Sequence, residues 1–159
     1  MKKHDHDHLA GEKPGNHMIQ ALLMVVFLLV WVVDSFFLRV TTILSALSPM
    51  WLNVALCIGV LSISAYYLNA SDRDLFHTED WGLKTKGVFS QVRNPMYLGI
   101  ALFYLSLIIL TLSLAALLVW LIICVYYDRL ANYEEARLQE EFGEEFLQYK
   151  KSVRKWIPV

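Results

Sequence analysis

A stretch of 34 residues without a charged side chain, residues 94–127, constrains the fold of this chain most strongly. One straight helix of that length would measure roughly 50 Å at about 1.5 Å per residue, whereas the hydrocarbon core of a bilayer is about 30 Å thick. We therefore expect a hairpin of two short helices that end near Leu110 and Tyr127. The turn should lie at residues 111–113, with Ser113 capping the second helix.

A hairpin returns the chain to the side of the membrane on which it began. Arg93 precedes the uncharged stretch, and the adjacent Glu134 and Glu135 follow it shortly. We therefore expect these charges to meet at one membrane face. Convergent charges beside lipid indicate a binding site for a polar ligand.

The distribution of apolar residues predicts an all-α integral membrane protein. Hydrophobic residues make up 57% of the 159-residue chain, its mean hydropathy is +0.44, and the apolar residues form long runs. We predict about four transmembrane helices, the last two being the hairpin, followed by an amphipathic C-terminal helix in the cytoplasm. The expected organisation is a polar, His-rich cytoplasmic tail over residues 1–17, a four-span membrane domain over 18–128 with a cytoplasmic loop at 70–94, and a C-terminal helix over 129–159.

The positive charges predict the orientation of these spans. Lysine and arginine number three in the first tail, one between the first two spans, four in the middle loop, none at the hairpin turn and six in the last tail. Because positive charges favour the cytoplasmic side, both termini and the middle loop should lie in the cytoplasm. This places the expected site where soluble cofactors are found, and the cytoplasmic membrane is the expected location.

Three polar features of the chain have more than one interpretation. Asp34 lies near the end of the first span, where it serves either the interface and helix pairing or a substrate or ion. The tail sequence HDHDH has a composition that binds divalent metals, but we interpret it as a polar extension and expect no metal site. Cys57 and Cys124 form no Cys-x-x-Cys pair, which argues against a disulfide oxidoreductase.

The C-terminal region has the spacing of one amphipathic helix with a bend. Gly143 weakens its middle, and the other side carries several glutamates. The apolar residues step by three and four positions, and we expect their face to cover the site. They are Leu138, Phe142, Phe146, Tyr149, Val153 and Trp156.

Two separate segments resemble the isoprenylcysteine carboxyl methyltransferase family, which is related to the phospholipid N-methyltransferases. The first is GVFSQVRNPMYLG at residues 87–99, and the resemblance covers residues ~48–159. The second contains Glu134, Glu135, Leu138, Phe142, Gly143, Phe146, Tyr149, Val153 and Pro158. The chain has the Arg-Asn-Pro form of the motif and a phenylalanine, Phe146, where tyrosine is frequent. The resemblance implies an integral membrane methyltransferase that uses S-adenosylmethionine.

The resemblance, together with the chemistry of S-adenosylmethionine, implies a set of cofactor-binding residues. Glutamate can hold an ammonium or ribose hydroxyls, Arg93 can clamp a carboxylate, and the helix N-terminus after Asn94 favours an anion. Tyr97 could pack on adenine. Gly99 lacks a side chain at a place where the cofactor or the partner arm of the hairpin must come close. The full set is Arg93, Asn94, Pro95, Tyr97, Gly99, Glu134 and Glu135.

The methyl acceptor is expected to be a lipidic or amphipathic molecule that enters from the bilayer. Arg154 or Lys155 would orient an acidic acceptor, and Glu135 or Asp34 would accept a proton. Isoprenylcysteine, a phospholipid amine, a quinone precursor and a small thiol all remain open. Membrane lipids are expected partners, nucleic acids are not, and the oligomeric state is open.

Three other classes of protein compete with this interpretation. A membrane reductase would bind NADPH at a similar pair of helices. A small four-span transporter would need charges facing the centre of the bundle, where only Asp34 is available. A non-catalytic relative would keep the fold alone, but the glutamate pair and Arg93 argue against it.

Overall fold

The computed structural model describes residues 15–76 and 82–158, and every regular element in these ranges is helical. The main helices are α1 (Asn16–Val32), α2 (Met50–Phe76), α3 (Pro95–Thr111), α4 (Leu114–Phe142) and α5 (Glu144–Ser152). A π-helical segment (Val33–Leu38) continues α1, and short 3₁₀ helices lie at Ile43–Ala46 and Gly87–Ser90. The predicted tail over residues 1–17 lies largely outside the described residues.

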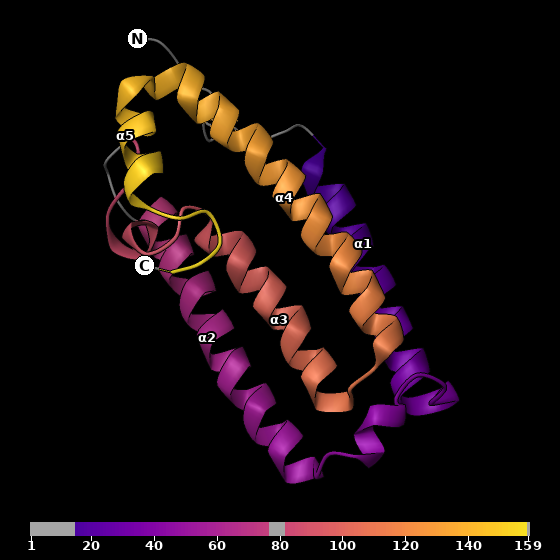
Figure 1. The fold of residues 1–159 in the computed structure, drawn as a ribbon. Helices are drawn as coiled ribbons and strands as arrows, with labels where there is room; N and C mark the ends of the chain where they lie inside the picture. The colour runs from indigo at the N-terminus through magenta and orange to yellow at the C-terminus, as the bar shows by residue number, and fades with distance from the viewer. Residues whose placement is uncertain (1–14, 77–81, 159) are drawn as a thin grey trace.

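The long helices form two packed pairs (Figure 1). α1 lies along α4 and α2 lies along α3, while α5 folds back at the end of α4. In the described part of the chain, three helical segments are long and apolar enough to cross a membrane: Asn16–Leu38, Met50–Leu75 and Leu114–Phe142. α3 is apolar but shorter. The predicted all-helical membrane fold is therefore confirmed, whereas the number of four crossings stays a prediction.

The predicted hairpin is present, but its second arm is much longer than expected. Leu112 adopts a left-handed conformation between α3 and α4, and the Ser113 side chain accepts a hydrogen bond from the Ala116 N–H, as predicted for a cap. The prediction that the second arm ends near Tyr127 is wrong, because α4 continues to Phe142. The loss of the apolar pattern marks where the membrane can end, but the Glu, Arg, Gln and Leu residues that follow are good helix formers.

The prediction of a single amphipathic C-terminal helix over residues 129–159 is likewise wrong in its bounds. Residues 129–142 belong to α4, and Gly143, with a φ of 53°, separates them from α5 at the predicted bend. Phe146, Tyr149 and Val153 form one buried cluster, whereas Trp156 packs against a different one. At the other boundary of the middle loop, α2 extends to Phe76, so residues 70–76 are helical.

The α2–α3 contact is closest at Gly99. An added Cβ atom there would lie 2.9 Å from Leu68 Cγ and 3.2 Å from the Leu68 backbone nitrogen. The Ser64 hydroxyl donates a hydrogen bond of 2.7 Å to the Gly99 carbonyl. Gly99 therefore serves helix packing in this structure, as small residues do where membrane helices approach closely.

Asp34 connects the end of α1 to the hairpin turn. Its buried carboxylate accepts hydrogen bonds from the Ser113 hydroxyl (2.5 Å), the Thr41 hydroxyl (2.5 Å) and the Thr41 N–H (3.1 Å). Of its two interpretations, this geometry supports helix pairing. Because the hairpin turn lies at the opposite end of α3 and α4 from Arg93, the contact anchors the bundle away from the charged residues (Figure 1).

Candidate functional site

Arg93 and Glu135 form a buried ion pair between the start of α3 and the C-terminal third of α4. Arg93 Nε lies 3.1 Å from Glu135 Oε1, and Arg93 Nη2 lies 3.3 Å from Oε2. The two side chains are 10% and 6% exposed. A planar guanidinium that binds both oxygens of a carboxylate is a strong and directional contact. The expected meeting of the Arg93 segment with the glutamate pair is thus observed.

Arg93 also fixes the chain after α5. Its Nη1 atom donates hydrogen bonds to the carbonyls of Lys150 (3.0 Å) and Val153 (2.7 Å), and its backbone N–H donates to the Arg154 carbonyl (3.0 Å). One arginine therefore joins α3, α4 and the C-terminal segment. The guanidinium group faces Glu135, so in this structure Arg93 is a structural link between these three segments.

Two further donors surround Glu135. Asn94 Nδ2 lies 3.1 Å from Oε1, and Lys150 Nζ lies 3.3 Å from Oε2. Asn94 occupies the N-cap position of α3 but makes no side-chain cap hydrogen bond, and Pro95 is the first helical residue. Asparagine is a common N-cap residue, but the Asn94 side chain binds the Glu135 carboxylate instead of the helix N-terminus. The first turn of α3 is left without a side-chain cap.

Glu134 belongs to a separate contact with Tyr97. The Tyr97 hydroxyl donates a hydrogen bond of 2.5 Å to Glu134 Oε1, and Glu134 is half-buried. The Tyr97 ring stacks on Tyr127 of α4, with centroids 5.1 Å apart and an angle of 28° between the planes. The face of Tyr97 that was expected to meet a ligand ring is thus partly used within the protein. Tyr127 was missed because it resembles any apolar-span aromatic residue.

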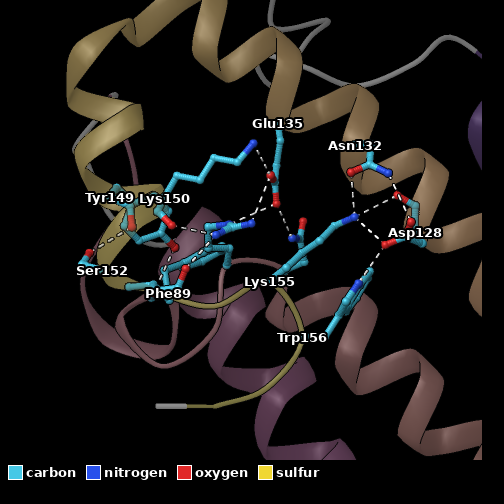
Figure 2. A network of polar contacts seen from close by, with 12 residues as sticks. Phe89, Asp128, Asn132, Glu135, Tyr149, Lys150, Ser152, Lys155 and Trp156 are labelled. Atoms are coloured by element: carbon cyan, nitrogen blue, oxygen red, sulfur yellow. Dashed lines mark hydrogen bonds and ion pairs between the residues drawn. The ribbon is translucent and has the colours of Figure 1, made fainter.

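Lys155 takes part in a third contact, with α4 (Figure 2). Its Nζ atom binds the side chains of Asp128 and Asn132, and the Trp156 indole N–H donates to Asp128. Arg154 is exposed and contributes its carbonyl to Arg93. Sequence reasoning missed Asp128 and Asn132, although their spacing of four residues just after the apolar run places them on one helix face.

Tyr149 fastens α5 to the turn that precedes α3. Its hydroxyl donates a hydrogen bond of 2.7 Å to the Phe89 carbonyl (Figure 2). Burial raises the pKa of the Tyr149 phenol, while nearby Arg93 acts in the opposite direction and Glu135 adds to the rise. The phenol therefore stays protonated and keeps this bond.

The predicted site residues thus fall into distinct groups. Arg93, Asn94 and Glu135 meet in one network, Tyr97 and Glu134 form a neighbouring pair, and Gly99 lies against α2. Lys150 joins the network of Glu135, and Asp128 and Asn132 bind Lys155. The sequence did not reveal these three residues. The arrangement places carboxylates, cations and an uncapped helix start at one end of a membrane bundle, which suits a ligand carrying both signs of charge.

Residues 39–145 match the model of a family described as phospholipid methyltransferase. The match covers about two thirds of the chain and contains both arms of the hairpin, the Arg93 segment and the glutamate pair. Among curated proteins no significant match is found.

Proposed function

Because the chain belongs to the phospholipid methyltransferase family, a family of membrane methyltransferases, we propose that it transfers a methyl group from S-adenosylmethionine to a lipidic or amphipathic acceptor at the cytoplasmic membrane interface. One observation carries the location of the site: Arg93 and Asn94 before α3 bind Glu135 of α4 at one end of the bundle. The family match supports neither the reductase nor the transporter. The narrower resemblance to isoprenylcysteine carboxyl methyltransferases stays a prediction.

The side chains fit the charged parts of S-adenosylmethionine. This cofactor supplies a methyl group on a sulfonium, which is strongly electrophilic without further activation. The half-buried Glu134 carboxylate suits an ammonium or the ribose hydroxyls. The first turn of α3, which Asn94 leaves without a side-chain cap, suits the carboxylate of the cofactor. The Glu134 carboxylate and the first turn of α3 are adjacent, because Tyr97 of that turn donates a hydrogen bond to Glu134.

Glu135 supports this site rather than reacting in it. Its two oxygens receive four donors, from Arg93, Asn94 and Lys150. We therefore assign Arg93, Asn94 and Glu135 the role of holding the start of α3 against α4. Such positioning matters because in-line group transfer depends on the alignment of the two reactants.

The family description makes a phospholipid headgroup the first acceptor to test. The outer faces of α1 and α2 expose many large apolar side chains, including Leu22, Leu29, Leu56 and Ile63, which suits contact with lipid. An amine acceptor must be unprotonated when it attacks the methyl group.

Calorimetric titration with S-adenosylhomocysteine tests the cofactor site. The detergent-purified protein should bind this product form saturably, and Glu134→Gln should weaken binding by at least about tenfold, or about 1.4 kcal/mol. Glu141→Gln, an exposed change on the same helix, is the matched control and should bind normally. Normal binding by Glu134→Gln would refute the assigned site, and no binding by the folded wild type would refute the cofactor.

A further inference from the structure

The chain after α5 places a lysine ammonium in a complete set of acceptors on α4. Lys155 Nζ lies 2.5 Å from Asp128 Oδ1, 3.2 Å from the Asp128 carbonyl and 2.8 Å from Asn132 Oδ1. An ammonium group has three N–H donors, and here each has an oxygen. Figure 2 shows Lys155 reaching across to α4 to make these contacts.

An indole ring completes the surroundings of this cation. Lys155 Nζ lies 5.3 Å from the centroid of the Trp156 ring, within the range of a cation–π interaction. Trp156 Nε1 donates to Asp128 Oδ1 at 2.9 Å, and Asn132 Nδ2 donates to Asp128 Oδ2 at 3.2 Å. These bonds hold the carboxylate and the ring in place. A carboxylate, an amide oxygen, a carbonyl and an aromatic face together recognise ammonium groups.

The lysine is easier to move than the two α4 residues that bind its ammonium group. Asp128 and Asn132 lie on the continuous helix α4, whereas Lys155 follows the end of α5 on an irregular segment. The Asp128 side chain is 46% exposed, so the acceptors can be reached from outside the protein. The long lysine side chain can rotate into solvent without moving the backbone of the segment, which Arg93 holds through the Arg154 carbonyl.

We propose that Asp128, Asn132 and Trp156 form an ammonium-binding site, and that Lys155 occupies it as an internal competitor of the ligand. The proposal rests on the proposed function, because the ligand would be a reactant of the methyl transfer. Two sources supply this chemistry: the amino-acid ammonium of the cofactor, or the ammonium headgroup of a phospholipid. In either case Lys155 must leave before the ligand binds, so this lysine limits affinity.

Removal of the competitor is the direct test. If Lys155 fills the site about nine tenths of the time, Lys155→Met should tighten binding of an ammonium ligand about tenfold. Lys151→Met, an exposed lysine of α5, is the matched control. Asp128→Asn in the Lys155→Met background should abolish the gain. Lys155→Gln provides a second variant. Both Lys155 variants should be monodisperse by gel filtration.

The probes distinguish the two sources. S-adenosylhomocysteine carries the ammonium and 5′-methylthioadenosine lacks it, so a gain in calorimetric affinity for the first alone identifies the cofactor. An unchanged S-adenosylhomocysteine affinity, with more phosphatidylethanolamine but not phosphatidylglycerol retained in native mass spectrometry, identifies the headgroup. Weaker or unchanged binding of both ammonium probes in the folded variants would overturn the proposal and leave Lys155 as a structural tie. Failure of the wild type and the variants to bind S-adenosylhomocysteine would refute the proposed cofactor, and the lipid measurement would still decide the ammonium site.

Discussion

The two ends of the bundle bury a carboxylate each, and they satisfy it with different partners. At the hairpin turn, Asp34 accepts from the hydroxyls of Ser113 and Thr41. Those same hydroxyls accept from the N–H groups of Ala116 and Ala115 at the start of α4. At the other end, Glu135 accepts mainly from the cations of Arg93 and Lys150.

The difference separates an anchor from a site. The Asp34 carboxylate binds neutral hydroxyls at the N-terminus of α4, where a negative charge is favourable. This arrangement offers little to a charged ligand. At the Arg93 end, the ion pairs act on the charges of a ligand. A charged group of the ligand can displace one partner of a pair or bind beside it. We therefore expect changes at the hairpin turn to affect stability, and changes at the Arg93 end to affect stability and binding together.

The strongest test of this comparison is removal of the Glu135 carboxylate. Glu135→Ala leaves Arg93 buried without its main partner and should lower the free energy of unfolding by about 3–5 kcal/mol. Equilibrium unfolding in mixed micelles measures the loss, with the exposed Glu141→Ala as control. A loss below about 1 kcal/mol would mean that the ion pair does not hold α3 to α4.

A smaller effect, confined to stability, is expected at the hairpin turn. Asp34→Asn keeps the shape but places an amide among hydroxyls that need an acceptor, and should cost about 2 kcal/mol. The affinity for S-adenosylhomocysteine should stay within about twofold of the wild type, a change of about 0.4 kcal/mol. Loss of binding in a well-folded Asp34→Asn protein would show that the hairpin turn is part of the site.

The packing between α2 and α3 supports both ends and can be tested with a matched pair of glycines. Gly99→Ala places a Cβ atom 2.9 Å from Leu68 Cγ and should cost about 1–3 kcal/mol through overpacking. Gly59 has no neighbour within 4 Å of an added Cβ, so Gly59→Ala should leave stability unchanged or raise it by up to about 1 kcal/mol. Equal losses in the two unfolding experiments would contradict the assigned contact.

The sequence predicted the features that depend on charge spacing. The uncharged run required a hairpin, and the hairpin brought Arg93 to Glu135. It could not predict where α4 ends, because a helix can continue from lipid into water when its residues favour helix. The bend at Gly143 was predicted from the low helix propensity of glycine, and the positive φ found there is one that glycine accepts.

Side-chain choices at the site depended on three-dimensional neighbours. Asn94 is a strong cap residue by type, yet the Glu135 carboxylate attracts its amide, because bonds to a charged acceptor are stronger. The contacts of Lys150 and Lys155 depend on the path of the chain after Gly143. No local pattern encodes that path. The site was therefore located by its ion pair, and its remaining members required the fold.

The smallest effect is expected at the Tyr97–Glu134 contact, where the cofactor is proposed to bind. Tyr97→Phe removes the hydroxyl that binds Glu134 while keeping the ring on Tyr127, and should cost about 1 kcal/mol of stability. Because this hydroxyl orients the carboxylate proposed to hold the cofactor, the affinity for S-adenosylhomocysteine should fall about fivefold. Tyr66→Phe, which removes a hydroxyl on α2, is the control and should bind normally. Unchanged binding in Tyr97→Phe, together with lost binding in Glu134→Gln, would mean that Glu134 holds the ligand without help from the Tyr97 hydroxyl, which would leave the backbone N–H groups of the first turn as the contribution of α3.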